Sequence, residues 1–187
     1  MIQTICICGA GTMGSGIAQS VAMGGFRVLL YDLNTDMLQK AGIAIEKSLS
    51  TLTEKNKISS AEKQAILDRI HYVGEAGDCI ADLIIEAIVE KLEAKLDLFH
   101  RLAPINKPTT ILATNTSSLS VTAIAEKISH PERVAGMHFF NPAPIMKLVE
   151  VVRTDLTNEP TIQMILGVVM QMGKTPVICK DSPGFVV

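Results

Sequence analysis

The sequence lacks tryptophan, and aromatic residues make up only 4% of its 187 residues. It also lacks an excess of positive charge, because 17 Lys and Arg stand against 19 Asp and Glu and leave a formal net charge of −2. A surface that follows nucleic-acid phosphates needs a clear excess of basic side chains. We therefore expect a protein with no nucleic-acid partner.

No apolar run approaches the ~18–20 residues needed to cross a bilayer, so we expect no membrane partner. The first residues form neither a charged n-region nor an Arg-rich amphipathic leader, and we expect neither a signal peptide nor a transit peptide. The four cysteines, at positions 6, 8, 79 and 179, lack CxxC spacing and nearby histidines at ligand distance. They are predicted to be reduced, mostly buried thiols of a cytoplasmic protein without a metal site.

What the sequence does contain is apolar: 48% of the residues are hydrophobic and 19% are charged, which suffices for a buried core. The length fits about one domain at the usual ~100–200 residues per domain. A mean hydropathy of +0.32 is high for a lone domain. The chain also stops on Phe185-Val186-Val187. We therefore expect one apolar face that lies against a second domain.

Short apolar runs alternate with helical segments along the chain. The predicted strands cover residues 2–8, 26–31, 71–73, 82–87, 110–114, 133–138, 147–152 and 175–179, and helices are predicted over residues 13–23, 90–103, 121–127 and 160–172. The strands are too apolar for burial on one side only, so both faces of the sheet should be covered. This pattern predicts a doubly wound, Rossmann-type α/β fold with a mostly parallel sheet.

Residues 36–70 depart from this alternation. They show helical spacing with many charges, and Lys55-Asn56-Lys57 marks a turn between two helices. A βα unit does not need so long a connection. We predict a helical hairpin inserted after the second strand.

A glycine motif, G-x-G-x-x-G, stands at residues 9–14 between a predicted strand and a predicted helix. Gly9 would let the chain turn off the strand, Gly11 would let the backbone approach a pyrophosphate, and Gly14 would let the helix pack close. Asp32 ends the second strand, where a carboxylate accepts hydrogen bonds from ribose hydroxyls and repels a 2′-phosphate. The motif alone is also compatible with a simple glycine-rich turn, but with Asp32 it predicts a site for NAD rather than NADP.

A histidine and a glutamate form the candidate catalytic pair. His138 ends an apolar strand before Phe139-Phe140-Asn141-Pro142, and strand ends line the ligand crevice of such sheets. Glu150 lies within another apolar strand, where a carboxylate is costly unless paired. Beside an imidazole it would select the tautomer and stabilise the protonated ring. Alternatively, it would cap a neighbouring backbone group or pair with Lys147.

A polar segment, Thr-Asn-Thr-Ser-Ser-Leu-Ser, follows another strand at residues 114–120. One of its serines is expected to cap the following helix. The segment could also form a polar shelf that binds a substrate oxygen. Serine hydrolysis is not indicated, because the chain lacks a G-x-S-x-G motif.

Five segments in order resemble the NAD-binding domain of the L-3-hydroxyacyl-CoA dehydrogenases, a family that includes 3-hydroxybutyryl-CoA dehydrogenase. They are GAGTMGSGIA at 9–18, EAIVE at 86–90, NTSSL at 115–119, HFFNPAPIMKLVEVV at 138–152 and KDSPGFVV at 180–187. The resemblance covers the whole chain. It implies oxidation of an (S)-3-hydroxyacyl-CoA to a 3-ketoacyl-CoA, or the reverse, with NAD as the cofactor.

The resemblance also implies roles for individual residues. His138 would take the proton of the 3-hydroxyl with Glu150 as its partner, and Ser117 and Asn141 would bind the substrate near the reacting carbon. The residues implied to contact NAD are Gly9, Gly11, Thr12, Met13, Gly14, Asp32, Glu90, Lys95, Ser117 and Asn141. Ser48 and Lys55 in the hairpin would contact coenzyme A, although Lys55 is equally compatible with a solvated helix position.

In this family a C-terminal helical domain closes the cleft and forms a homodimer, and residues 1–187 correspond to the NAD-binding domain alone. Two alternatives to the acyl-CoA reaction remain open. One is a related dehydrogenase acting on a non-CoA hydroxy acid. The other is a non-catalytic NAD-binding module.

Overall fold

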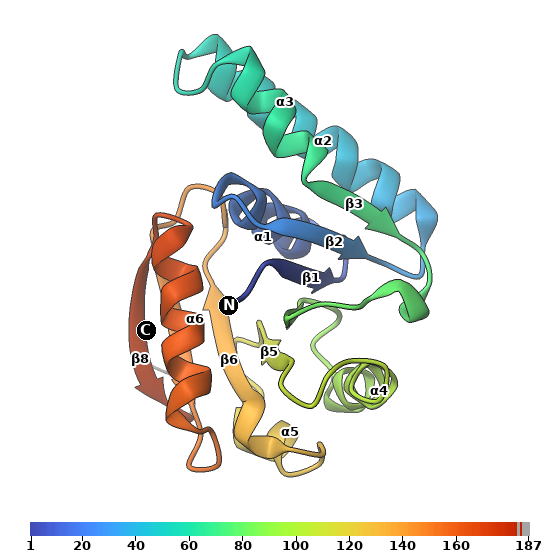
Figure 1. The fold of residues 1–187 in the computed structure, drawn as a ribbon, viewed down its shortest axis with the longest axis vertical. Coiled ribbons are helices and arrows are strands. Elements are labelled where there is room, and N and C mark those ends of the chain that lie inside the picture. The colour runs from blue at the N-terminus through green and yellow to red at the C-terminus, as the bar shows by residue number, and fades with distance from the viewer. Residues whose placement is uncertain (183, 185–187) are drawn as a thin grey trace.

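The computed structural model describes residues 1–182 and residue 184 (Figure 1). In chain order its elements are β1 (Thr4–Cys8), α1 (Thr12–Met23), β2 (Arg27–Tyr31), α2 (Thr35–Glu54), α3 (Ser60–Asp68), β3 (Ile70–Val73), the 3-10 helix η1 (Ala76–Asp78), β4 (Leu83–Glu86), α4 (Leu92–Leu102), β5 (Ile111–Thr114), α5 (Val121–Ala125), the 3-10 helix η2 (Pro131–Arg133), β6 (Val134–Phe139), β7 (Leu148–Arg153), α6 (Glu159–Gln171) and β8 (Thr175–Lys180). The apolar segment 185–187 lies outside the described residues.

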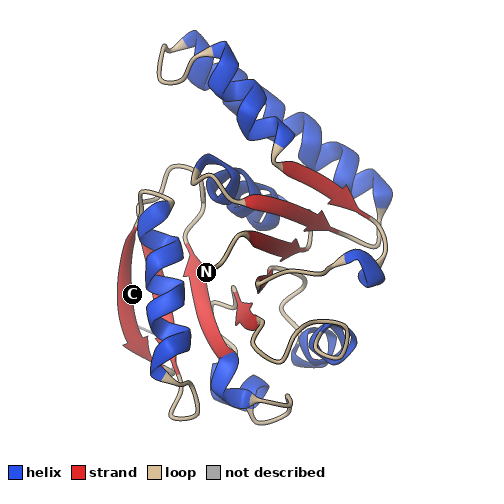
Figure 2. Ribbon diagram, in the orientation of Figure 1, coloured by secondary structure: helices blue, strands red, loops and turns tan. Residues whose placement is uncertain are grey.

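The strands form one eight-stranded sheet in the order β3-β2-β1-β4-β5-β6-β7-β8. The first six strands in this order pair in parallel, β7 runs antiparallel to β6, and β8 is parallel to β7. Figure 2 shows the helices distributed around this sheet. The prediction of a mostly parallel Rossmann-type fold is therefore confirmed.

Both faces of the sheet are covered, as the apolar strands require. Along β1, Ile5 and Ile7 belong to the apolar core that also contains Ile17 of α1 and Ile162 of α6. The alternate residue Cys8 belongs to a second core, which includes residues of α4 and α5. Because successive side chains of a strand point to opposite faces, a strand buried on both sides is apolar at nearly every position.

The helical hairpin after β2 consists of α2 and α3, which extend beyond the sheet edge at β3 (Figure 1). Leu38, Ile45 and Leu49 are buried along one face of α2, at the spacing of an amphipathic helix. A capping box between Ser59 and Glu62 starts α3.

The element boundaries differ from the sequence prediction by a few residues. Helix α4 begins at Leu92 rather than at residue 90, and α5 ends at Ala125 rather than at residue 127. The carboxylate of Glu90 is instead bonded to Thr116 and Ser117 in the loop after β5. Among the described residues, no helix combines the length and apolar composition needed to cross a membrane.

Candidate active site

Two neighbouring cavities lie at the carboxyl ends of the parallel strands, where this class of sheet binds ligands. The first has a volume of about 360 Å³, and its lining includes Met13, Glu90, Lys95, Asn115, Ser117, His138 and Asn141. The second has a volume of about 340 Å³, and its lining includes Gly9, Tyr31, Asp32, Leu33, Val89 and Arg101. Ile88 lines both. The fold thus brings most of the sequence-predicted site residues to one edge of the sheet.

The glycine loop has the close packing that the motif predicts. Gly9 has φ +104°, and a Cβ at Gly14 would lie 1.7 Å from the carbonyl oxygen of Gly9. A Cβ at Gly11 would meet nothing within 4 Å, so space is open over the start of α1. No side chain caps this helix at Gly11, and the first amides of an α-helix have no intrahelical acceptor. The loop therefore fits a pyrophosphate at a helix N-terminus.

Asp32 lies directly after β2 and beside the glycine loop. Its Oδ2 accepts a hydrogen bond from the Ala10 amide at 2.8 Å, and its Oδ1 accepts one from the Asn34 amide at 2.9 Å. These bonds fix the carboxylate at the wall of the second cavity while leaving lone pairs for further donors. The position fits a ribose whose hydroxyls donate to Asp32.

His138 and Glu150 form a direct pair. They stand opposite each other in the antiparallel register of β6 and β7, so their side chains share one face of the sheet. His138 Nδ1 lies 2.6 Å from Glu150 Oε2. Glu150 is fully buried, whereas the His138 side chain is 16% exposed and lines the first cavity. The pairing of Glu150 with Lys147, considered from sequence, is not what forms; Lys147 Nζ donates to the Gly173 carbonyl instead.

The loop after β5 forms the opposite wall of the first cavity. The amide of Ser117 donates to Glu90 Oε1 at 3.1 Å, which holds the loop against the segment after β4. Asn115 Oδ1 accepts a hydrogen bond from the Phe139 amide at 2.8 Å and ties the same loop to β6. Ser120 caps α5 by accepting a hydrogen bond from the Ala123 amide, as expected of one serine in this segment.

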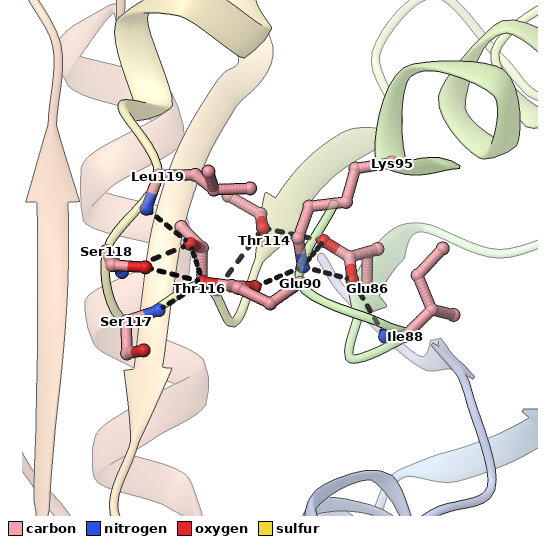
Figure 3. A network of polar contacts seen from close by, with 9 residues as sticks. All are labelled: Glu86, Ile88, Glu90, Lys95, Thr114, Thr116, Ser117, Ser118 and Leu119. Atoms are coloured by element: carbon pink, nitrogen blue, oxygen red, sulfur yellow. Dashed lines mark hydrogen bonds and ion pairs between the residues drawn. The ribbon is translucent and has the colours of Figure 1, made fainter. Parts of the chain in front are cut away.

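A buried polar network, drawn in Figure 3, underlies this wall. Lys95 bridges Glu90 and Glu86, and the Glu86 side chain is fully buried. Burial alone would raise the pKa of Glu90, but the hydrogen bond from Thr116 and the Lys95 ammonium outweigh it and hold this pKa below its usual range. Sequence reasoning did not single out Glu86. The available signal was a carboxylate ending an apolar strand, the same signal that drew attention to Glu150.

Ser48 and Lys55 lie apart from this cluster. Ser48 is half-buried within α2, and Lys55 is exposed at the C-cap of the same helix. Neither is among the residues that line the two cavities. In the part of the chain that the structure describes, no group of three or more His, Cys, Asp or Glu could hold a metal ion.

A known protein family matches this chain over most of its length. The profile described as "3-hydroxyacyl-CoA dehydrogenase, NAD binding domain" matches residues 4–182. The chain is 44% identical to 3-hydroxyadipyl-CoA dehydrogenase of Escherichia coli, covering all of this chain and 39% of that protein. It is 45% identical to a probable 3-hydroxybutyryl-CoA dehydrogenase of Deinococcus radiodurans, covering 96% of this chain and 65% of that protein.

A solved structure, that of (S)-3-hydroxybutyryl-CoA dehydrogenase from Ralstonia eutropha, matches all of this chain and 66% of its own chain with a TM-score of 0.98 and 39% identity. The chain thus spans less than two thirds of each of these proteins. NAD is the cofactor of the matched domain, in agreement with the glycine loop and Asp32. The chain belongs to the family of 3-hydroxyacyl-CoA dehydrogenase NAD-binding domains.

Proposed function

We propose that the protein containing this domain oxidises an (S)-3-hydroxyacyl-CoA to the 3-ketoacyl-CoA, or catalyses the reverse reduction, with NAD. The observation that carries the proposal is the His138–Glu150 pair in a cavity adjoining the NAD-binding loop. A buried carboxylate bonded to an imidazole orients the ring and stabilises its protonated form, which is what a general base requires.

In the proposed reaction, Glu150 accepts a hydrogen bond from the Nδ1–H of His138 and so fixes the tautomer in which Nε2 is basic. The 3-hydroxyl of the substrate gives its proton to Nε2. The Glu150 carboxylate then stabilises the imidazolium at a distance of 2.6 Å. NAD, when bound, supplies the hydride acceptor. In the reverse direction the same imidazolium returns the proton to the forming alkoxide.

Ser117 and Asn141, which both line the first cavity, are proposed to bind the oxygens near the reacting carbon. Phe139 and Phe140 also line this cavity and would exclude water from it. Glu90 and Lys95 are proposed to border the nicotinamide half of the cofactor, because they line the cavity that adjoins the ribose site.

Coenzyme A is proposed as the carrier because the similar proteins are named as dehydrogenases of 3-hydroxyadipyl-CoA and 3-hydroxybutyryl-CoA. Ser48 and Lys55 are proposed to contact it along the hairpin, where the exposed Lys55 ammonium would attract its phosphates. We also propose that a C-terminal helical domain of the whole protein completes the acyl pocket and forms a homodimer. Sedimentation of the full-length protein would test the dimer, and a monomer would contradict it.

The decisive experiment mixes the full-length protein with acetoacetyl-CoA and NADH and follows absorbance at 340 nm. We expect consumption of NADH, and a loss of about 10²–10⁴-fold in kcat for His138→Ala, because the proton then has no positioned acceptor. NADH titration by fluorescence serves as the control for folding, since His138→Ala should still bind the cofactor.

Two outcomes would contradict the proposal. Tight NADH binding without turnover would indicate a non-catalytic module. Turnover of a free hydroxy acid that coenzyme A does not inhibit would indicate the non-CoA alternative.

A further inference from the structure

Glu86 is a fully buried carboxylate that has no role in the proposed reaction. It ends β4, and its neighbours in register are Cys8 of β1 and Thr114 of β5. A carboxylate inside a sheet costs free energy unless hydrogen bonds and an opposite charge compensate it. Glu86 has this compensation. Its Oε1 accepts a hydrogen bond from the Ile88 amide at 2.8 Å, and its Oε2 accepts one from Thr114 Oγ1 at 2.6 Å.

The opposite charge comes from Lys95, which α4 directs into the same site. The Lys95 side chain is 1% exposed, and its Nζ lies 2.7 Å from Oε1 and 2.9 Å from Oε2 of Glu86. The same nitrogen lies 2.9 Å from Oε2 of Glu90. The Lys95 ammonium is therefore held between two carboxylates, and the Glu86 carboxylate is the fully buried one of the two.

Glu90 connects Lys95 to the loop after β5. Its Oε1 accepts hydrogen bonds from Thr116 Oγ1, from the Ser117 amide at 3.1 Å and from Ser118 Oγ at 3.3 Å. Figure 3 shows these contacts converging on Glu90 from one side while Lys95 approaches from the other. The position of the Ser117 backbone thus depends on where Lys95 holds Glu90.

A second route from Glu86 reaches the same loop without Lys95. Thr114 Oγ1 donates to Glu86 and accepts a hydrogen bond from the Thr116 amide at 3.3 Å. Thr116 Oγ1 in turn accepts hydrogen bonds from the amides of Ser118 and Leu119, at 3.3 and 2.9 Å. Both routes begin at the Glu86 carboxylate and end at the wall of the first cavity.

We propose that Glu86 is a positioning residue of the cleft: it holds Lys95 and Thr114 so that Glu90 and Ser117 stay in place for the cofactor and the substrate. The expected change in NAD binding follows from the residues that line the cavity and from the family. The expected change in substrate binding rests on the proposed function. In Glu86→Gln the amide oxygen can still accept one hydrogen bond from Lys95, but the negative charge and the second acceptor are lost, so the attraction of Lys95 to Glu90 is no longer balanced by Glu86. Lys95 then draws Glu90 away from the Ser117 loop.

The test uses Glu86→Gln in the full-length protein, with the NADH dissociation constant measured by fluorescence titration and the acyl-CoA KM measured separately. We expect both constants to rise about 10-fold, the loss typical of one hydrogen bond to a charged group. A purely structural role predicts another result: fewer active molecules, hence a lower apparent kcat, with NADH affinity and KM unchanged. Unchanged constants would overturn the proposal.

Arg133→Met is the matched control, because Arg133 is also a buried charged residue that bonds the backbone, at the carbonyls of Lys107 and Thr110. It precedes β6, at the end of the strand opposite His138. Arg133→Met should lower stability without changing either constant; a rise as large as that in Glu86→Gln would overturn the proposal.

If Glu86→Gln does not fold, Thr114→Val provides the second variant, since it removes one link to Glu86 and keeps the buried charges balanced. The acyl-CoA KM of Thr114→Val should also rise, and an unchanged KM would overturn the proposal. The NADH dissociation constant tests whether Glu86 positions the cofactor site even if the protein reduces no acyl-CoA. Failure of the proposed function can therefore be distinguished from failure of this proposal.

Discussion

At the scale of the residue, two buried carboxylates lie near the candidate active site. Glu86 and Glu150 each stand in an otherwise apolar strand, and neither is exposed to solvent. Their partners differ: the Lys95 amino group accompanies Glu86, and the His138 imidazole accompanies Glu150. The first pair is suited to holding a structure in place, whereas the second can change its protonation during a reaction.

Two glycines of the same loop should respond differently to an added methyl group. In Gly14→Ala the new Cβ would lie 1.7 Å from a backbone oxygen, so the chain must shift and the melting temperature should fall by several degrees. In Gly11→Ala the Cβ enters open space, so the melting temperature should stay within about 2 °C. The methyl group would then occupy the path of the pyrophosphate and weaken NADH binding.

Thermal unfolding and NADH titration of both variants distinguish these effects. The prediction fails if Gly11→Ala binds NADH as the unmodified protein does, or if Gly14→Ala keeps its melting temperature.

At the scale of the element, helix α5 is short and depends on a residue distant in sequence. Asp181 accepts hydrogen bonds from the amides of Val121 and Thr122 and from Ser120 Oγ. Burial would raise the pKa of Asp181, but these hydrogen bonds outweigh it and lower the pKa. A carboxylate at a helix N-terminus also interacts favourably with the helix dipole.

Replacing Asp181 by Asn should therefore have an effect that depends on pH. Because the folded-state pKa is below the unfolded value of about 3.9, the charge stabilises the protein above that pH, and the contribution is lost as the pH falls through the folded value. We expect Asp181→Asn to lose roughly 0.5–1 kcal/mol at pH 7, allowing for solvent screening, and to match the unmodified protein near pH 2. Urea unfolding at the two pH values checks this, and an equal loss at both would contradict it.

The elements themselves were largely predictable, because apolar runs and helical periodicity are properties of neighbouring residues. All eight predicted strands form, with ends shifted by one or two residues. The direction of β7 was not predictable from its own residues, since a buried strand has the same composition in either direction. The partner of Glu150 was inferred as one of several alternatives, and only the β6–β7 register resolves them. Glu86 also ends an apolar strand, but its own residues do not indicate its partners Lys95 and Thr114, which the fold brings to it from 9 and 28 residues away.

For the molecule as a whole, the NAD-binding loops follow three neighbouring strands of the sheet that come from separate parts of the sequence. Residues from the ends of β1, β2 and β4 line the second cavity together with residues of α4. A cofactor bound there contacts only the folded state, so binding and unfolding are linked.

NADH at 100 times its dissociation constant should raise the free energy of unfolding by about 2.7 kcal/mol. For a chain of this size that corresponds to a rise of roughly 5–10 °C in the melting temperature. Scanning calorimetry with and without NADH measures the shift. NADPH at the same concentration should give less, because the Asp32 carboxylate repels a 2′-phosphate; an equal shift would contradict the assigned preference for NAD.

The antiparallel pairing of β6 and β7 also has a consequence for how the cleft assembles from the unfolded chain. His138 and Glu150 are 12 residues apart, whereas the Asp82 carboxylate that joins β4 to the start of β1 bonds a residue 78 positions away. Closing the longer loop costs about 1.7 kcal/mol more chain entropy than closing the shorter one. The His138–Glu150 pair therefore belongs to a local hairpin, while the second cavity, which also needs residues after β4 and in α4, exists only once distant parts of the chain have met.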